Sequence, residues 1–336
     1  MLVYLLSGIF CFLPSFLTAN ASKINDIKAR GHVKCGVSTG LPGFSYVDTD
    51  GIWRGFDVDF CRATAAAIFG DPDKVDFTPL TSKTRFSALQ SDEIDVLIRN
   101  TTWNFSRDTS LGLGFSAINF YDGQAFMVPK SLHVKHVYDL DGASICMVQG
   151  TTTEMNTQQY FEKRGLEYKP VYFEKTDQMI VSYQAGRCDA MTGDASAMAA
   201  LKSISQDPEE QLILPERISK EPLAIMVKDN DPQWLKLTRW VVWATLEAEE
   251  LQITQENIDE KLVTPDQHTS NFLEVDADAA KLVGVPTNFT EHIVRGVGNF
   301  AEIYDRHFGN DSAFQMERGQ NALWLNGGLM YPPPFN

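Results

Sequence analysis

Apolar, strand-like runs alternate with helix-like patterns along the first third of the chain, and this alternation constrains the fold more than any other feature. The runs at 33–37, 75–80 and 94–98 are separated by an alanine-rich helical pattern over 57–69, closed by Gly70, and by a short one that Thr84 can cap. Strands alternating with helices build a largely parallel sheet with helices on both faces. We therefore expect a doubly wound α/β fold.

The same alternation returns between residues 145 and 192. Strand-like runs lie at 145–148, 171–173 and 188–192, and helical patterns lie at 151–164 and 177–186, the second capped by Asp177. Thr151 and Glu154 have the spacing of a capping box, and Gly165 follows the first of these helical patterns. Because 336 residues are many for a single core, we expect two α/β lobes.

Two short apolar segments, at 126–130 and 223–227, are candidates for the crossings between these lobes. They predict a first lobe over 22–126, an inserted second lobe over 127–224, and a return to the first lobe over 225–336. Asp231 and Pro232 have the chemistry of a helix start, so the returning segment should begin with a helix. More helix is expected in the C-terminal extension.

The N-terminal residues predict export. Residues 1–17 carry no charged side chain, and Ala19-Asn20-Ala21 has the small-x-small pattern of a cleavage site. We expect a signal peptide over 1–21 and a periplasmic mature protein. The alternative is a transmembrane anchor, which the short apolar stretch, broken by Pro14, disfavours. Cys11 lacks the preceding small residues that lipid attachment needs.

Charge and motifs exclude several classes of function. With 29 Lys and Arg against 44 Asp and Glu, the net charge of −15 argues against binding nucleic acid and favours a soluble monomer. There is no H-E-x-x-H, phosphate-loop or C-x-x-C pattern. We therefore expect no enzyme activity, no cofactor and no metal site.

Four cysteines follow the predicted cleavage site: Cys35, Cys61, Cys146 and Cys188. An even number in an exported protein favours disulfides, and the sequence alone leaves three pairings open. Buried free thiols are the alternative.

Polar residues follow the predicted strands at the edge where open α/β sheets bind ligands. Thr102 and Arg107 come after the strand at 94–98 and suit a carboxylate, and so do the amides of a helix beginning at Thr151 and Thr152. Asp194 follows the strand at 188–192 and suits an ammonium group. A molecule with both groups is an α-amino acid.

Each of these residues also has a structural interpretation. Arg107 can form a surface salt bridge, and Asp194 can cap a helix over 195–201. The aromatic side chains of Phe44, Tyr46 and Trp53 can line a cleft or pack in a core, and Lys83 can meet an acidic ligand or stay in solvent.

Several motifs together resemble the periplasmic solute-binding proteins of polar amino-acid ABC transporters, known as family 3. The resemblance covers nearly all of the mature chain and rests on order and spacing. Its motifs are Cys35-Gly-Val-Ser-Thr-Gly-Leu-Pro-Gly-Phe44, Gly55-Phe-Asp-Val-Asp59, Arg99-Asn-Thr-Thr-Trp103, Ser106-Arg-Asp-Thr109, Val148-Gln-Gly-Thr-Thr152, Gly186-Arg-Cys-Asp-Ala190, Ile218-Ser-Lys-Glu-Pro-Leu223, Ala248-Glu-Glu-Leu251 and Asn321-Ala-Leu-Trp324.

The resemblance implies a type II periplasmic binding protein whose two lobes, joined by two hinge segments, close on a ligand. It places Arg107, Thr102 and the amides of Thr151 and Thr152 on the ligand carboxylate, and Asp194 with the carbonyl near Asn100 on the ammonium. It puts around the side-chain pocket Ser38, Leu41, Phe44, Ser82 and Lys83. It also implies the disulfides Cys35–Cys61 and Cys146–Cys188. Relatives of narrow specificity stack the ligand on an aromatic where this chain has Ser82, which suggests a permissive pocket.

The expected function is therefore the capture of L-amino acids, with broad specificity, for a membrane permease of an ABC transporter. One alternative is an enzyme on the same fold, such as a cyclohexadienyl or arogenate dehydratase, for which Asp194 is the one obvious acid or base. Others are a narrow binder of glutamate, glutamine or aspartate, and a sensor domain, which the lack of a later membrane-spanning segment disfavours.

Overall fold

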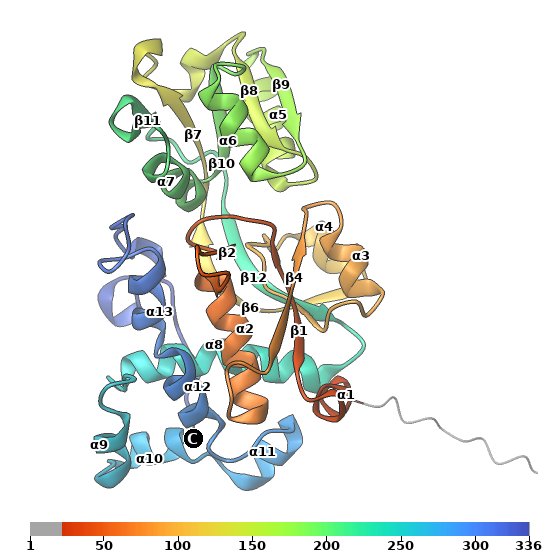
Figure 1. Ribbon diagram of the computed structural model, residues 1–336, viewed down its shortest axis with the longest axis vertical. Helices are drawn as coiled ribbons and strands as arrows, with labels where there is room; N and C mark the ends of the chain where they lie inside the picture. Colours follow the sequence, from red (N-terminus) through yellow and green to blue (C-terminus); the bar gives the residue numbers. More distant parts are fainter. Residues whose placement is uncertain (1–21, 336) are drawn as a thin grey trace, which may run out of the picture.

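A computed structural model describes residues 22–335 of the chain as two α/β lobes, one above the other (Figure 1). The predicted signal peptide, residues 1–21, lies outside the described part. The first lobe contains a five-stranded sheet of order β4-β1-β5-β12-β6. Its strands are β1 (Val33–Ser38), β4 (Val75–Leu80), β5 (Val96–Leu97), β6 (Leu113–Asp122) and β12 (Glu221–Lys228).

Strands β1, β4 and β5 are parallel, with Cys35 opposite Phe77 on one side and Val96 on the other. The helices between them are α2 (Phe56–Phe69) and α3 (Arg85–Gln90). Helix α2 ends at Gly70, whose left-handed φ of 68° lets its N–H reach the carbonyl of Ala66. The strand–helix alternation that the sequence predicts for this lobe is confirmed.

The second lobe repeats this design. Its sheet has the order β11-β7-β10-β8-β9, in which β8, β9 and β10 are parallel. The strands are β7 (Gln124–Pro129), β8 (Ser144–Val148), β9 (Lys169–Phe173), β10 (Ala190–Asp194) and β11 (Gln211–Ile213), and the helices are α5 (Thr152–Arg164), α6 (Thr176–Gln184) and α7 (Ala195–Ser203). In both sheets an antiparallel strand, β12 or β7, enters from the other lobe. The predicted pair of α/β lobes is therefore confirmed.

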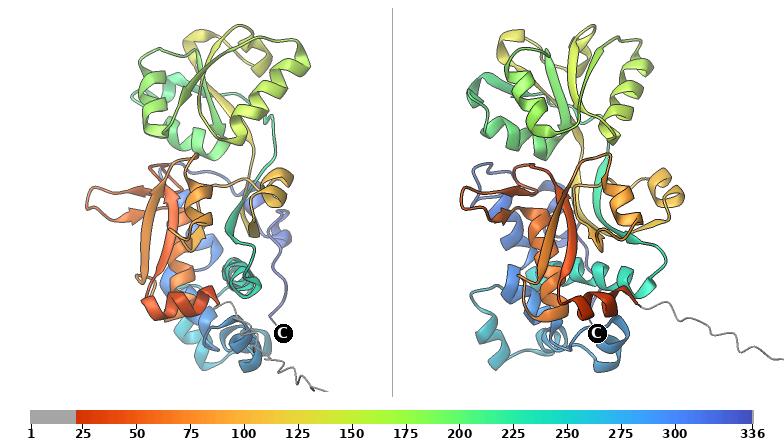
Figure 2. Two further views of the ribbon diagram at one scale, coloured as in Figure 1. Left: turned by 90° about the vertical axis from the view of Figure 1, so that its right-hand side faces the viewer. Right: turned by 45° about the vertical axis from the view of Figure 1, so that its right-hand side comes forward.

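The chain crosses between the sheets a few residues before the segments that the sequence suggested. Residues 126–130 and 223–227 lie mostly within β7 and β12, because their apolar side chains are buried in the lobes. One crossing is instead at Gly123, between β6 and β7, and the other directly precedes Glu221. A Cβ on Gly123 would lie 2.9 Å from the carbonyl oxygen of Ser219. The two crossings are therefore adjacent, as the ribbons show (Figure 2).

The C-terminal third adds helices to the first lobe alone. Helix α8 (Pro232–Glu250) begins at Asp231, whose carboxylate accepts from the Trp234 N–H as predicted. The later helices are α9 (Ile258–Val263), α10 (Gln267–Leu273), α11 (Ala277–Val283), α12 (Phe289–Val297) and α13 (Phe300–His307). Helices α9, α10 and α11 gather at the end of the first lobe farthest from the second, and α12 and α13 run back along α2 toward the second lobe (Figure 1). Between residues 22 and 335, no helix has the length and apolar character needed to cross a membrane.

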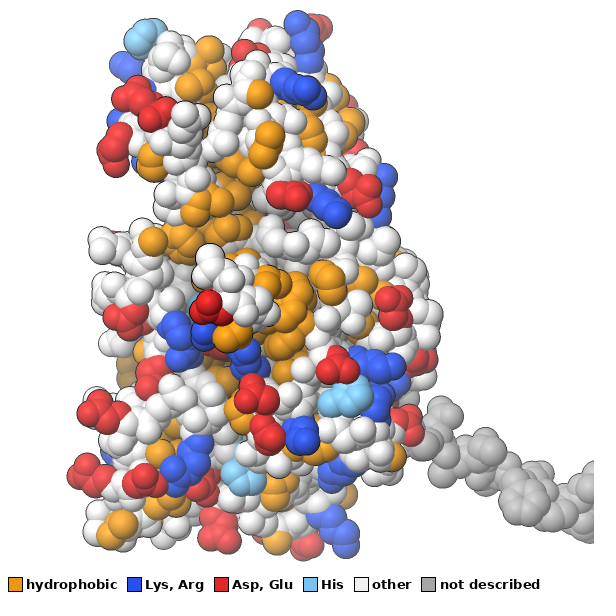
Figure 3. Space-filling view, in the orientation of Figure 1, with side chains coloured by type: hydrophobic (Ala, Val, Ile, Leu, Met, Phe, Trp, Pro, Cys, Tyr) orange, Lys and Arg blue, Asp and Glu red, His pale blue; other side chains and the backbone are white. Residues whose placement is uncertain are grey.

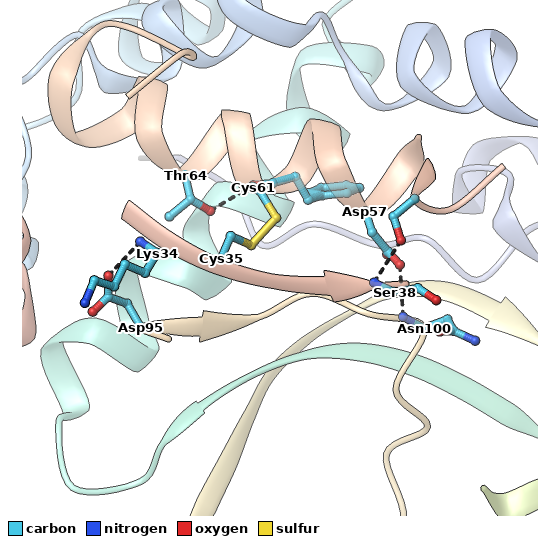
Figure 4. Close-up of a disulfide and its surroundings, with 10 residues drawn as sticks. Lys34, Cys35, Ser38, Asp57, Cys61, Thr64, Asp95 and Asn100 are labelled. Atoms are coloured by element: carbon cyan, nitrogen blue, oxygen red, sulfur yellow. Dashed lines mark hydrogen bonds between the residues drawn. A yellow bond between two sulfur atoms is a disulfide. The ribbon is translucent and has the colours of Figure 1, made fainter. Parts of the chain in front are cut away.

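Two disulfides link Cys35 to Cys61 and Cys146 to Cys188. This is the pairing that the resemblance implied. The first joins β1 to α2 (Figure 4) and the second joins β8 to the segment before β10, so each bridge stays within one lobe. Neither bridge ties one lobe to the other.

Replacing both Cys35 and Cys61 by Ser should lower the free energy of unfolding by about 3.5 kcal/mol. This figure follows from the chain entropy that a cross-link over 26 residues removes from the unfolded state. Urea denaturation under oxidising conditions measures it, with the wild type in reductant as a parallel comparison. A double variant as stable as the oxidised wild type would contradict the bridge.

Candidate functional site

A polar cavity lies between the lobes, at the carboxyl ends of the parallel strands in both sheets. The first lobe contributes to its lining Ser38, Leu41, Ser82, Arg85, Arg99, Asn100 and Thr102. The second contributes Val148, Thr151, Thr152, Thr153, Thr176, Met179, Thr192, Gly193, Asp194, Ala197, Met198 and Leu201. In the space-filling view, charged side chains are spread over the outer surfaces of both lobes, and the molecule narrows where the lobes meet (Figure 3). This edge of the sheets is where the sequence placed the site.

Asn100 follows β5 in an unusual backbone conformation, with a φ of 30°. The carboxylate of Asp57 on α2 holds it there by accepting from the Asn100 N–H at 3.0 Å (Figure 4). The Cys35–Cys61 bridge fixes α2 against β1 one turn away from Asp57. Burial raises the pKa of Asp57 from its ordinary 3.8 to about 7.

Asp194 is the last residue of β10 and stands at the N-cap position of α7, but its side chain makes no capping hydrogen bond. Asp122, at the end of β6, takes that role: its carboxylate accepts from the N–H groups of Ala195 and Ser196 and from the Ser196 hydroxyl. The carboxylate of Asp194 is therefore available to the cavity. The helix-capping interpretation of Asp194 is wrong for this structure.

Asp194 also contacts the other lobe, because the side-chain amide of Asn100 donates to its carboxylate at 3.0 Å. Burial raises the pKa of Asp194 well above its ordinary value, and the nearby carboxylates of Asp122 and Glu221 raise it further. A cationic group in the cavity would relieve both effects.

Two buried arginines face the cavity from the first lobe, and the sequence analysis gave neither of them a role. Arg99 donates to the carbonyl of Leu80 at 2.9 Å and to the Ser82 hydroxyl at 3.1 Å. Arg85 donates to the Thr101 hydroxyl at 3.3 Å, and its buried Nε has no partner. Burial lowers the pKa of Arg99 to about 10 and that of Arg85 well below its ordinary value, which an anion in the cavity would oppose.

The first turn of α5 supplies unoccupied amides. Thr151 is its N-cap residue but makes no capping bond, since its hydroxyl donates to the carbonyl of Val148. Glu154 accepts from the N–H of Gly150 at 3.2 Å and not from that of the N-cap residue Thr151, so the predicted capping box does not form. Residues 151–153 line the cavity, and the start of α5 has no side-chain cap, as an anion site requires.

Glu221 lies where the chain returns to the first lobe, and the sequence analysis quoted it only as part of a motif. It pairs with Asp122 across β12 and β6 and is 2% exposed. Its carboxylate accepts from Thr102 in the first lobe, from Thr152 and Asn156 in the second, and from Ser219. It therefore joins the two lobes at the edge of the cavity.

Most of the predicted site residues line this cavity, namely Ser38, Leu41, Ser82, Asn100, Thr102, Thr151, Thr152 and Asp194. Phe44 does not line it: it is fully buried and packs edge-on against Phe308 and Phe120, because the C-terminal helices cover it with aromatic side chains. Tyr46 and Trp53 belong to the short hairpin of β2 (Tyr46–Val47) and β3 (Trp53–Arg54), where Tyr46 lies opposite Arg54 and Trp53 opposite Val47, and neither lines the cavity.

Lys83 and Arg107 lie beside the cavity and not in its lining. Lys83 is exposed and lies next to Gly150 of the second lobe. Arg107 is half-buried on α4 (Phe105–Ser110), stacks over the ring of Phe86 and donates to the carbonyl of Thr102 at 2.9 Å. The carboxylates of Glu221 and Asp194 act on its charge, opposing the lowering of its pKa by burial. Arg107 is thus within electrostatic reach of the cavity.

Two α/β lobes joined by adjacent crossings, with a polar cavity between them, define a solute-binding protein. Residues 33–310 match the bacterial extracellular solute-binding proteins, family 3, and the chain belongs to that family. The resemblance seen in the sequence is therefore confirmed.

Several binding proteins match this chain along nearly their whole length. The chain is 48% identical, over 94% of its residues and 93% of the relative, to the general L-amino acid-binding periplasmic protein AapJ of Rhizobium johnstonii. It is 44% identical, over 94% of each protein, to the glutamate/glutamine/aspartate/asparagine-binding protein BztA of Rhodobacter capsulatus. A solved ABC transporter periplasmic binding protein from Brucella ovis, with glutathione bound, is 46% identical with a TM-score of 0.91, covering 94% of this chain and 100% of that one.

The raised pKa of Asp57 predicts a pH-dependent contribution to stability. Between pH 4 and 7 the folded chain keeps a proton that the unfolded chain has lost, so the stability that Asp57 contributes falls as the pH rises through this window. The difference in melting temperature between wild type and Asp57→Asn should therefore shift against the wild type from pH 4 to pH 8. A difference that stays constant, or shifts the other way, would show that Asp57 titrates normally.

Proposed function

We propose that the protein captures L-amino acids in the cavity between its lobes. The observation that carries this proposal is the placement of charges across the cavity. The buried carboxylate of Asp194 lies on one lobe, and buried guanidinium groups lie on the other. Asp194 and the region of Asn100 suit the α-ammonium group. Arg107 and the amides at the start of α5 suit the α-carboxylate. The names of the relatives AapJ and BztA support the same ligand class.

A second anionic group on the ligand would meet Arg85 and Arg99. The hydrogen bonds of both guanidiniums go to neutral oxygens, so neither forms an ion pair in the contacts described, although the carboxylate of Asp194 acts on both charges from a distance. Ser82 and Ala197 are small and leave room beside them. We therefore propose broad binding of L-amino acids with a preference for those whose side chain carries a carboxylate. Glutathione, the ligand of the Brucella ovis relative, also carries a second carboxylate.

Capture would proceed by closure of the lobes about the two adjacent crossings at Gly123 and before Glu221. The ligand's two charges join walls that belong to different lobes, and closure is favoured as far as the ligand prefers the closed form. We propose that the mature protein acts as a monomer in the periplasm, after removal of residues 1–21, and delivers its ligand to the membrane permease of an ABC transporter.

Calorimetry against all L-amino acids should give binding for many of them, with glutamate and aspartate the tightest. D-amino acids and dicarboxylic acids without an ammonium group serve as controls and should bind at least ~10-fold more weakly. A dicarboxylic acid has no ammonium group for Asp194, and a D-amino acid with its ammonium and carboxylate in place would direct its side chain away from the side-chain pocket. Glutathione belongs in the same series. A single amino acid bound to the exclusion of all others would rule out the broad specificity, and no binding of any amino acid would rule out the ligand class.

Variants of Arg107 and of Arg85 should change the affinities for different sets of amino acids in this assay. Arg107→Ala should weaken every L-amino acid alike, by about 3 kcal/mol, because each loses the partner of its α-carboxylate. Arg85→Met should weaken glutamate and aspartate by ~10-fold or more and leave alanine and glutamine within ~3-fold. Lys83→Met, outside the cavity, is the matched control. If Lys83→Met and not Arg85→Met lowers the affinity for glutamate, the side-chain anion binds elsewhere.

A further inference from the structure

Glu221 lies beside the cavity without lining it. Its carboxylate accepts the hydroxyl protons of two residues that do line the cavity. One oxygen of its carboxylate, Oε2, accepts from the hydroxyls of both Thr102, at 2.5 Å, and Thr152, at 2.9 Å. The other, Oε1, accepts from the Asn156 amide at 2.7 Å and from the Ser219 hydroxyl at 2.5 Å. A carboxylate has room for about four donors, so this one is fully used.

A hydroxyl group has one proton and two lone pairs. Because Thr102 and Thr152 both direct that proton to Glu221, neither has a proton left to donate to a ligand. Both residues line the cavity, and their hydroxyl oxygens lie 3.4 Å apart. What they present to the cavity is lone pairs, which accept from a cation and repel a carboxylate oxygen.

The backbone fixes this arrangement. Thr102 pairs with Leu223 across an isolated bridge, and the Trp103 N–H donates to the carbonyl of Pro222 at 2.8 Å. The loop after β5 is thereby held against the start of β12, next to Glu221. Thr152 is the first residue of α5, so its hydroxyl is fixed relative to the amides of the same turn.

We propose that Glu221 is a positioning residue that turns the hydroxyl protons of Thr102 and Thr152 away from the cavity, so that both hydroxyls accept from the ligand's α-ammonium group. This inference rests on the proposed function. It moves the Thr102 hydroxyl from the carboxylate half of the site, where the sequence analysis placed it, to the ammonium half beside Asp194. The α-carboxylate is left to Arg107 and the α5 amides, which are donors only.

The test compares L-glutamate with glutarate, which lacks the ammonium group, by calorimetry on the full mature protein. Glu221→Gln keeps one acceptor oxygen, and Glu221→Met keeps none at similar length. Glu221→Met should weaken L-glutamate by ~10-fold or more and leave glutarate unchanged or tighter, because the released hydroxyl protons can now donate to a carboxylate. Glu221→Gln should lie between the wild type and Glu221→Met. Ser219→Ala, which removes a donor to the same carboxylate without touching the cavity hydroxyls, should stay within ~3-fold for both ligands.

A double-mutant cycle makes the test independent of glutarate and of general destabilisation. In a Thr102→Val/Thr152→Val background there are no hydroxyls to orient, so adding Glu221→Gln should change the affinity for L-glutamate by less than ~3-fold. If Glu221→Gln costs the same in both backgrounds, or if glutarate and glutamate weaken together, Glu221 supports the fold and does not orient the hydroxyls. If the wild type binds no L-amino acid at all, the proposed function itself has failed.

Discussion

The site depends on two carboxylates on neighbouring strands at the point where the chain passes between the lobes. Asp122 and Glu221 pair across β6 and β12, and each reaches into the second lobe. Asp122 accepts from the first amides of α7, and Glu221 accepts from Thr152 and Asn156 of α5. The N-terminal turns of both helices are therefore held by the strands that connect the lobes. Since those turns carry Asp194 and the amides that we propose bind the α-carboxylate, the connection between the lobes and the proposed site share their hydrogen bonds.

This arrangement explains how a residue at a helix-capping position can leave its carboxylate to the cavity. An aspartate before a helix normally accepts from the first turn, which would use the carboxylate of Asp194. With Asp122 in that role, Asp194 accepts from the neutral amide of Asn100 and is buried near two other carboxylates. Its pKa is raised well above the ordinary value, although the charge of Arg85 opposes the rise. In the unliganded site, burial therefore disfavours the negative charge of Asp194. Burial likewise disfavours the positive charges of Arg85 and Arg99. A zwitterionic ligand would offset both penalties, because its ammonium group would pair with the carboxylate and its carboxylate with a guanidinium group.

Features that depend on neighbouring residues in the chain could be predicted from the sequence. Features that depend on tertiary packing could not. Strands β1 and β4 and helices α2 and α5 follow from apolar runs and from glycines such as Gly70 and Gly165, which act within a few residues. The polar residues after β5 and β10 were found for the same reason. Phe44 was misplaced because only the packing of α13 and Phe308 onto it shows that it is core. Arg85 has no signal in its own neighbourhood, since the cavity it faces is formed by the other lobe. The crossings were expected a few residues late, because apolar runs mark strands and the true crossing at Gly123 is polar and close-packed.

The closeness of the two crossings at Gly123 and Ser219 has a geometric consequence. Two connections lying side by side define a single hinge axis about which the lobes turn. Residues near this axis hardly move apart when the lobes open, and residues far from it move apart most. Glu221 lies at the hinge axis, so it can keep its hydrogen bonds to both Thr102 and Thr152 during an opening that separates Ser82 from Met179. The ammonium half of the site would then persist in the open state, ready to receive a ligand before the margins meet.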